Sequence, residues 1–162
     1  MGGDAFKGAG VYSRKAFDNK GDVVAHRGQK SRLTEVTSDI KKSVQPKEWH
    51  FNNDTIVVLN KFHSSLGKRN ITVFYTFPCI PESWYSQNKE QVRYVHNRLN
   101  SELKITMLGS SEDFIFPDSY FYDRVYHLND DGLELRMKKL TYLLENALVL
   151  QKQSSGRATS FR

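Results

Sequence analysis

Between residues 54 and 149, apolar residues alternate between helical spacing and short continuous runs, and this alternation limits the possible folds more than any other feature of the chain. In chain order, the pattern predicts a helix over 54–67, a strand over 71–77, a helix from about residue 88 to 103, a strand over 105–108 and a last helix from about residue 130 to 149. Because a helix that joins two strands places them in parallel, we expect an α/β fold in which helices cover a parallel sheet. Two strands alone leave unpaired edges and an apolar face, so the pattern is typical of the C-terminal half of an α/β sandwich.

Capping residues and inward positions complete this prediction. Asp54 is the expected N-cap of the first helix, and Gly67 is the expected left-handed residue at its end. Asn129 or Asp130 is expected to cap the last helix, whose first turn carries acidic residues that suit the helix dipole. The apolar faces are predicted to be formed by Ile56, Leu59, His63 and Leu66 in the first helix, by Val92, Val95, Leu99 and Leu103 in the second, and by Leu133, Met137, Leu140, Leu144 and Leu148 in the last.

The rest of the chain has no comparable regularity. Its 162 residues are enough for one domain. Residues 1–53 form a loop-rich segment in which glycines are frequent, residues 54–150 form the α/β portion, and residues 151–162 form a polar tail that we expect to be disordered. A long irregular segment is typical of an active-site loop or of the remnant of a larger structure.

Composition excludes several classes of protein. A hydrophobic fraction of 38% with 26% charged residues is typical of a soluble globular chain. The sequence contains no apolar run long enough to span a membrane and no signal-peptide core at its N-terminus, so we expect a cytoplasmic protein, unless a lost N-terminal segment carried such a signal. The single cysteine, Cys79, excludes an internal disulfide.

The net charge of +6 makes nucleic-acid binding an alternative that has to be weighed. The cations are spread along the chain without a block of five or six, and most fall where solvated helix faces or helix C-termini are expected. A charged surface therefore explains them better than a nucleic-acid interface, and we do not expect nucleic acid as a partner.

An acid and a histidine four positions apart, Asp123 and His127, directly precede the last helix. A carboxylate beside an imidazole can fix its tautomer and stabilise its protonated form, which leaves the second ring nitrogen to accept a proton from a nucleophile. The positive end of the following helix would help to keep the imidazole neutral and basic. We therefore predict Asp123 and His127 as catalytic residues, with Asp118 as an alternative acid. The simpler interpretation is a histidine bonded to backbone at a helix entry and an ordinary turn aspartate.

Other reactive side chains are better explained by structural roles. Cys79 lies in a Pro-Cys-Ile-Pro loop without a helix N-terminus or a nearby cation, so we expect a buried, unreactive thiol. Ser110 and Ser111 are expected in a turn or cap. No metal or cofactor is expected, because the histidines outside the pair have no ligand spacing. The aromatic residues that could line an acyl or sugar pocket, or equally cover the core, are Trp84, Tyr85, Tyr120, Phe121 and Tyr122.

The segment around the pair resembles a known family. Its residues Phe116-Pro117-Asp118, Tyr122-Asp123, Tyr126-His127-Leu128-Asn129, Gly132 and Arg136, followed by a long helix, resemble the closing block of SGNH/GDSL-type hydrolases. Further likenesses are found at Tyr12-Ser13-Arg14, Phe17, Gly21-Asp22-Val23-Val24 and His26, and at Phe77-Pro78-Cys79-Ile80-Pro81. The resemblance implies a flavodoxin-like three-layer α/β/α fold and ester or acyl-group hydrolysis by a serine, histidine and aspartate triad, with His127 as the base and Asp123 as the acid. The implied substrate is an ester, or an acylated small molecule or saccharide.

The chain departs from this family at the nucleophile. Gly3-Asp4-Ala5 and Gly21-Asp22-Val23 lack the serine of the family's Gly-Asp-Ser motif, and Phe51-Asn52-Asn53-Asp54 lacks the glycine expected before its Asn-Asp pair. The spacing between acid and histidine is also one residue longer than is usual in the family. We therefore expect a truncated hydrolase whose serine and oxyanion hole lie in a missing N-terminal portion. The alternatives are a non-catalytic binding or interaction module on the same scaffold and a basic nucleic-acid-binding protein, and the oligomeric state stays open.

Overall fold

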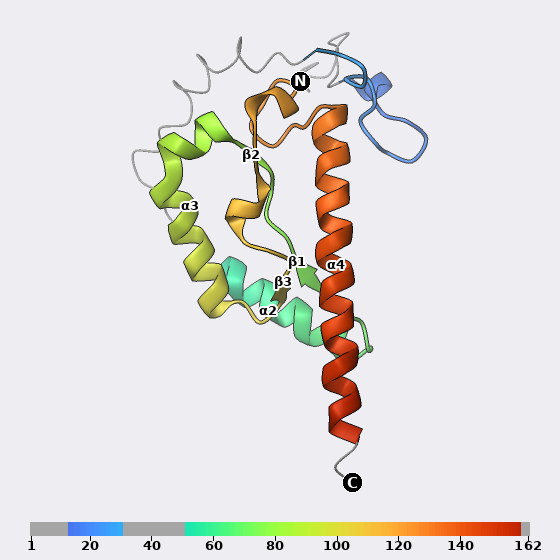
Figure 1. Ribbon diagram of the computed structural model, residues 1–162, viewed down its shortest axis with the longest axis vertical. Coiled ribbons are helices and arrows are strands. Elements are labelled where there is room, and N and C mark those ends of the chain that lie inside the picture. Colours follow the sequence, from blue (N-terminus) through green and yellow to red (C-terminus); the bar gives the residue numbers. More distant parts are fainter. Residues whose placement is uncertain (1–12, 31–50, 160–162) are drawn as a thin grey trace, which may run out of the picture.

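The structure of the protein is a computed structural model that describes residues 13–30 and 51–159 (Figure 1). Its elements are, in chain order, the 3-10 helix η1 (Arg14–Ala16), helix α2 (Asn53–Gly67), strands β1 (Phe74–Tyr75) and β2 (Ile80–Pro81), helix α3 (Glu82–Glu102), strand β3 (Thr106–Met107), the 3-10 helix η2 (Ser111–Phe114), strand β4 (Ile115–Phe116), the 3-10 helix η3 (Asp118–Tyr120) and helix α4 (Asp130–Thr159). Helices and strands are both present along the described chain, which confirms the predicted α/β class.

The strands pair in parallel, as the alternation of helices and strands predicts. Phe74 of β1 lies opposite Thr106 of β3, and Ile80 of β2 lies opposite Ile115 of β4. The two predicted strands are confirmed in position, but β1 and β3 each extend over two residues only. The sequence pattern does not predict β2 and β4, because each has only two residues and is interrupted by a proline, Pro81 at the end of β2 and Pro117 directly after β4. Each sheet of the described chain has two strands.

Both ends of helix α2 differ from the predicted ends. The side chain of Asn52 accepts a hydrogen bond from the backbone N–H of Asp54 at 3.0 Å, so Asn52 and not Asp54 is the N-cap. At the other end, the left-handed residue is Asn70, with φ of 57°, and not Gly67. Asparagine occupies both positions. It caps helices as well as aspartate does, and it adopts the left-handed backbone conformation more readily than most residues. Ile56 is buried, which confirms the inward face of the helix.

Helix α3 combines two helical segments that meet at Asn88. The predicted helix begins near Asn88, whereas α3 begins at Glu82 and is kinked at Asn88, where φ is −125° and ψ is 20°. The Asn88 side chain donates a hydrogen bond to the Trp84 carbonyl at 2.8 Å, which satisfies a backbone acceptor next to the kink. Three predicted inward residues are confirmed, because Leu99 is buried and Val95 and Leu103 pack against the core.

The hydrophobic core lies where the helices meet the strand-bearing segments. In the view of Figure 1, these segments run between α3 and α4. The buried residues of the core are Ile56, Phe77, Cys79, Leu99, Phe114, Phe116 and Phe121. Helix α4 contributes Leu140 and Leu143, which are partly buried against this cluster.

Helix α4 is longer than predicted. Its start is as expected, because Asn129 Oδ1 accepts a hydrogen bond from the Gly132 N–H at 2.9 Å and two aspartates occupy the first turn. The predicted end lies near Val149, whereas the helix continues to Thr159 and so includes residues 151–159 of the segment that the sequence assigned to a disordered tail. Figure 1 shows that its C-terminal part projects beyond the other described elements.

The predicted inward face of α4 is mostly exposed. Leu140 packs against the core, but Leu133, Met137, Leu144 and Leu148 have between 38% and 53% of their surface exposed. Leu143, which the pattern does not assign to the buried face, also packs against the core. The apolar stripe therefore identifies the helix correctly but not the side by which it packs, because two short strands per sheet cannot cover its whole width.

Residues 13–30 pack against the start of α4. The Gly28 N–H donates a hydrogen bond to the Asp130 carboxylate at 2.6 Å. The Tyr122 hydroxyl donates to Gln29 Oε1 at 2.8 Å. This part of the predicted loop-rich segment therefore reaches the region of the acid and histidine, and residues 1–12 and 31–50 of that segment lie outside the described residues.

Candidate functional site

A tight loop between η3 and α4 brings Asp123 and His127 together. Phe121 and Tyr122 before the loop are buried, and the Tyr122 N–H donates a hydrogen bond to the His127 carbonyl at 2.7 Å. The His127 N–H in turn donates to the Arg124 carbonyl at 3.0 Å. Within this loop, Asp123 Oδ1 lies 2.7 Å from His127 Nδ1. The contact between the predicted acid and the predicted base is therefore present.

The pair is shielded but not sealed from solvent. The side chain of Asp123 is 14% exposed and that of His127 is 23% exposed. A carboxylate that accepts a hydrogen bond from Nδ1 fixes the tautomer in which the lone pair lies on Nε2. The alternative acid, Asp118, has a different role, because its carboxylate accepts the N–H of Ser83 at 3.1 Å at the start of α3. Asp123 is therefore the acid that faces the imidazole.

A second imidazole, that of His26, lies against the first. The ring centroids of His26 and His127 are 4.7 Å apart, and the ring of Tyr122 lies 5.6 Å from that of His26. Among the described residues, the buried Nδ1 of His26 has no hydrogen-bond partner. Burial lowers the pKa of His26, and the charge of His127 lowers it further. Sequence spacing does not place His26 beside His127, because it relates only residues that are close in the chain. The one signal for His26 in the sequence is its place in the upstream segment that resembles the hydrolases.

Cys79 is buried, as predicted, with 2% of its surface exposed. The expectation that no cation lies nearby is wrong, because Arg136 of α4 places Nη1 3.1 Å from the Cys79 Sγ and 3.3 Å from the Phe77 carbonyl oxygen. Burial raises the pKa of the Cys79 thiol, and the guanidinium opposes this with a smaller effect. The expectation of an unreactive thiol therefore remains.

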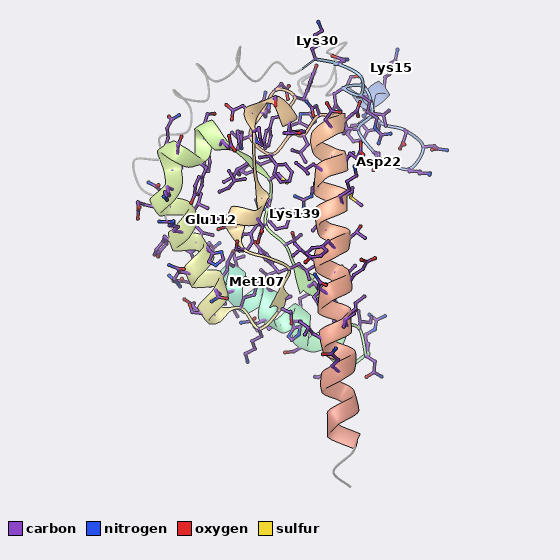
Figure 2. The ribbon with its side chains drawn as sticks, in the orientation of Figure 1. Lys15, Asp22, Lys30, Met107, Glu112 and Lys139 are labelled. Atoms are coloured by element: carbon purple, nitrogen blue, oxygen red, sulfur yellow. The ribbon has the colours of Figure 1, made fainter. Side chains whose placement is uncertain are left out.

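The two serines after β3 have structural roles. Ser110 precedes η2, and its N–H and its hydroxyl bind Asp113 Oδ2 at 2.8 Å and 3.0 Å, which confirms the predicted cap. Ser111 is buried, and its N–H donates to His96 Nδ1 at 3.2 Å. Lys139, which Figure 2 labels on α4, reaches the same aspartate. Its Nζ lies 3.4 Å from Asp113 Oδ1. Neither serine contacts the imidazole of the pair.

The predicted aromatic residues divide between the core and a cavity. Tyr120, Phe121 and Tyr122 lie in or against the core. Trp84 lines a cavity of 170 Å³ beside helix α3, and Tyr126 from the loop of the pair lines the same cavity. We call it the α3 cavity. Four of the five predicted aromatic residues therefore lie in the core or beside this cavity, whereas the Tyr85 hydroxyl donates a hydrogen bond to Glu112 Oε1 at 2.7 Å.

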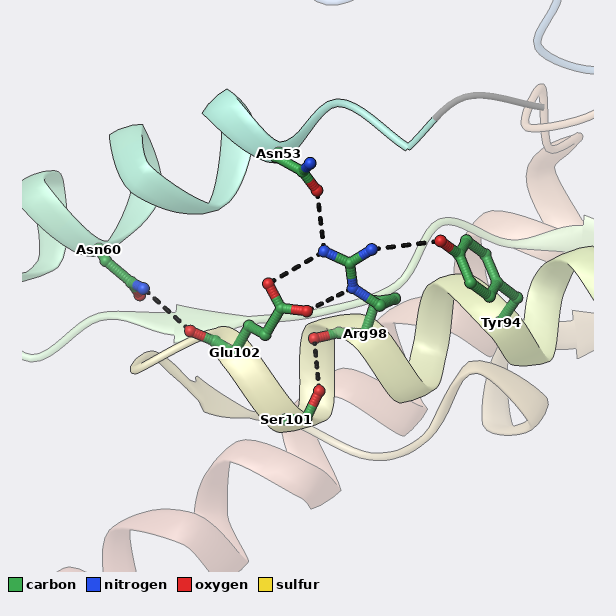
Figure 3. Close-up of polar contacts among 6 residues, drawn as sticks. All are labelled: Asn53, Asn60, Tyr94, Arg98, Ser101 and Glu102. Atoms are coloured by element: carbon green, nitrogen blue, oxygen red, sulfur yellow. Dashed lines mark hydrogen bonds and ion pairs between the residues drawn. The ribbon is translucent and has the colours of Figure 1, made fainter. Parts of the chain in front are cut away.

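Polar contacts join the start of α2 to α3. Arg98 binds both carboxylate oxygens of Glu102, and it also reaches the Asn53 side chain at 2.8 Å and the Tyr94 hydroxyl at 3.2 Å (Figure 3). Its guanidinium lies 4.7 Å from the centre of the Phe51 ring. The Glu102 carboxylate raises the pKa of Arg98. This cluster is structural, because its cation is already matched by an acid and an aromatic ring.

Within 13–30 and 51–159, no group of three or more histidine, cysteine or acidic side chains is arranged to hold a metal ion, and His50 lies outside these ranges. None of the helices described here combines the length and the apolar character that crossing a bilayer requires.

Comparison of the chain with protein-family models, with curated proteins and with solved structures found no match. The resemblance to SGNH/GDSL-type hydrolases therefore rests on the residues of the sequence.

Proposed function

We propose that the chain supplies the acid and the base of an ester hydrolase of the SGNH/GDSL type. The observation that carries the proposal is the 2.7 Å contact between Asp123 Oδ1 and His127 Nδ1, in a partly shielded loop just before the N-terminus of α4. The parallel strand pairs support the flavodoxin-like fold of such enzymes as part of the same proposal. The substrate class is an ester or an acylated small molecule, including an acylated saccharide.

The proposed mechanism uses both nitrogens of the His127 ring. Asp123 holds the proton on Nδ1, so Nε2 accepts the proton of the hydroxyl that attacks the ester carbonyl. The carboxylate stabilises the imidazolium that forms, and Nε2 then gives the proton to the leaving alcohol as the carbon–oxygen bond breaks. In the complete mechanism the attacking hydroxyl belongs to a serine outside the described residues, and water then releases the acyl group.

Hydrolysis of p-nitrophenyl acetate tests the pair directly. This activated ester reacts with an imidazole, or with water that an imidazole activates, and so it reports the pair even without a serine. We expect His127→Gln and Asp123→Asn each to lower the protein-dependent rate by about 10²-fold, which is the usual contribution of a positioned base.

The matched control is His63→Gln on α2, which removes one half-exposed imidazole away from the loop. A second control is Asp131→Asn, which removes an exposed acid from the first turn of α4. Both controls should retain the wild-type rate. Equal rates for His63→Gln and His127→Gln, or no protein-dependent hydrolysis at all, would reject the hydrolase proposal for this chain.

The second candidate is a non-catalytic binding module on the same scaffold. The observation that favours it is that Cys79 and Ser110 contact Arg136 and Asp113 rather than the imidazole of the pair. This candidate predicts a cooperative thermal transition together with the absence of His127-dependent hydrolysis.

Nucleic-acid binding has less support among the described cations. Arg93 lies 3.0 Å from Glu112, and Lys138 lies 2.6 Å from Glu134, so these cations have acidic partners in the same chain. Binding of DNA or RNA that weakens steeply with added salt would reverse this interpretation.

A further inference from the structure

The α3 cavity has the size and the lining of a site for a small hydrocarbon group. Its volume is 170 Å³, and its walls include Phe77, Trp84, Val92 and Val95. An apolar cavity of about 150 Å³ is known to bind benzene, so this one has room for roughly six carbon atoms. None of the described residues that line it carries a charge. A charged ligand would therefore lose its hydration without gaining a partner.

The aromatic wall of the cavity is held in place from behind. The ring of Phe77 stacks on that of His96, with centroids 5.2 Å apart and an angle of 17° between the planes. Tyr75 meets the Phe77 ring edge-on at 5.4 Å. His96 is itself bound by the Ser111 N–H at 3.2 Å. A wall that is fixed before the ligand arrives loses little conformational freedom on binding.

Tyr126 connects the α3 cavity to the catalytic pair. It directly precedes His127 in the chain, and its φ of 87° lies in a region that bulky residues rarely adopt. The hydrogen bond from the Tyr122 N–H to the His127 carbonyl closes the loop around this strained residue. Across this turn, the Tyr126 side chain lines the cavity while the His127 side chain contacts Asp123.

We propose that the α3 cavity binds the acyl part of the substrate, an uncharged hydrocarbon group of about six carbons. The assignment of this hydrocarbon group to the acyl part of an ester rests on the proposed function, whereas binding of the group itself requires no catalysis. Affinity should increase by about fourfold for each methylene group, because burial of each one removes apolar surface from water. The increase should stop near six carbons, where the cavity is full.

Titration with 1-alkanols from ethanol to 1-decanol tests the proposal on the full chain. Trp84 reports binding by its fluorescence in a Trp49→Phe background, which removes the other tryptophan. We expect a saturable change with 1-hexanol and a tighter affinity for it than for ethanol. A change that does not saturate, or an affinity that does not increase from ethanol to 1-hexanol, would overturn the proposal.

Val92→Phe fills the cavity and should abolish the response to 1-hexanol. The matched control is Val57→Phe, which adds the same ring at a position on α2 that is 49% exposed and lies away from the cavity, and it should respond like the wild type. Tyr126→Ala tests the wall without disturbing the core, since Tyr126 is exposed, and it should weaken binding severalfold. Equal responses of the Val92→Phe and Val57→Phe variants would overturn the proposal.

The two proposals can fail separately. Saturable 1-hexanol binding without His127-dependent hydrolysis supports the cavity as a binding site and rejects the hydrolase. His127-dependent hydrolysis without 1-hexanol binding supports the hydrolase and rejects the acyl site.

Discussion

The imidazole rings of His26 and His127 lie with their centroids 4.7 Å apart and their planes inclined by 48°. His26 belongs to the segment over 13–30, which is attached to α4 by the hydrogen bond from Gly28 to Asp130. The segment therefore forms one side of the candidate site. Burial, and then the charge of His127, lower the pKa of His26, so the folded chain resists protonation at this position.

We expect His26 to make the folded state less stable in acid. The ordinary pKa of a histidine is 6.5, and the pKa of His26 in the folded chain is lower. Between these two values the unfolded chain binds more protons than the folded chain, so stability is lost as the pH falls below about 6.5. His26→Phe keeps an aromatic ring and removes this titration. Its urea midpoint should change less between about pH 7.5 and about pH 5 than that of the wild type.

The control for this experiment is His63→Phe, which alters a histidine on α2 and should keep the wild-type pH dependence. An unchanged pH dependence in His26→Phe would show that protonation of His26 does not limit stability in acid.

We expect position 132 to require glycine, because α4 approaches η3 closely there. A Cβ atom at Gly132 would overlap the Tyr120 carbonyl oxygen and would lie 3.0 Å from Leu128 Cδ2. Alanine would gain about 1 kcal/mol of helix propensity. Displacement of the backbone costs more, so Gly132→Ala should lower the free energy of unfolding by about 1–3 kcal/mol.

Gly67→Ala provides the comparison within α2, because a Cβ atom there meets nothing within 4 Å. This variant should be neutral, or more stable by up to about 1 kcal/mol. Urea unfolding of both variants measures the difference, and equal effects at the two glycines would contradict the close contact at Gly132.

Leu143 and Leu144 are neighbours in the chain but differ in their surroundings. Leu143 packs against the core, whereas Leu144 is 38% exposed. Leu143→Ala should therefore lower the free energy of unfolding by about 2–3 kcal/mol. Leu144→Ala should cost less than about 1 kcal/mol. Denaturation of the two variants checks the orientation of α4, and a larger loss at Leu144 would mean that the helix packs by its other side.

Cys79 is expected to resist alkylation while the chain is folded. Its thiol is buried, and burial raises its pKa, so little thiolate is present and reagents cannot reach it. Iodoacetamide should react with the folded protein at least about 10²-fold more slowly than with the protein in urea. Similar rates in both conditions would show that Cys79 becomes accessible through local opening.

Local spacing predicts much of the fold. The repeat of apolar residues places α2 and α3, and the runs around Phe74 and Thr106 place β1 and β3. Their parallel pairing follows from the helix that joins them. Local spacing does not predict that Asn52 caps α2, because several polar residues near the helix start could serve equally well. It also does not predict the kink at Asn88 within α3.

The orientation of α4 is decided by contacts between distant segments. Its stripe of leucines fits a buried face, but the approach of Gly132 to Tyr120 and the bond from Arg136 to the Phe77 carbonyl turn Leu140 and Leu143 towards the core. The same kind of contact brings His26 to the site, because no short-range spacing relates it to His127.

The sequence by itself determined helices α2, α3 and α4, strands β1 and β3, and an acid within reach of an imidazole, because these depend on residues a few positions apart. Only the tertiary structure decided that His26 lies beside His127, that Tyr126 links the loop of Asp123 and His127 to the α3 cavity, and that most of the α4 stripe is exposed. The physical reason is that packing between distant segments depends on shape and volume, which leave no periodic signal in the order of the residues.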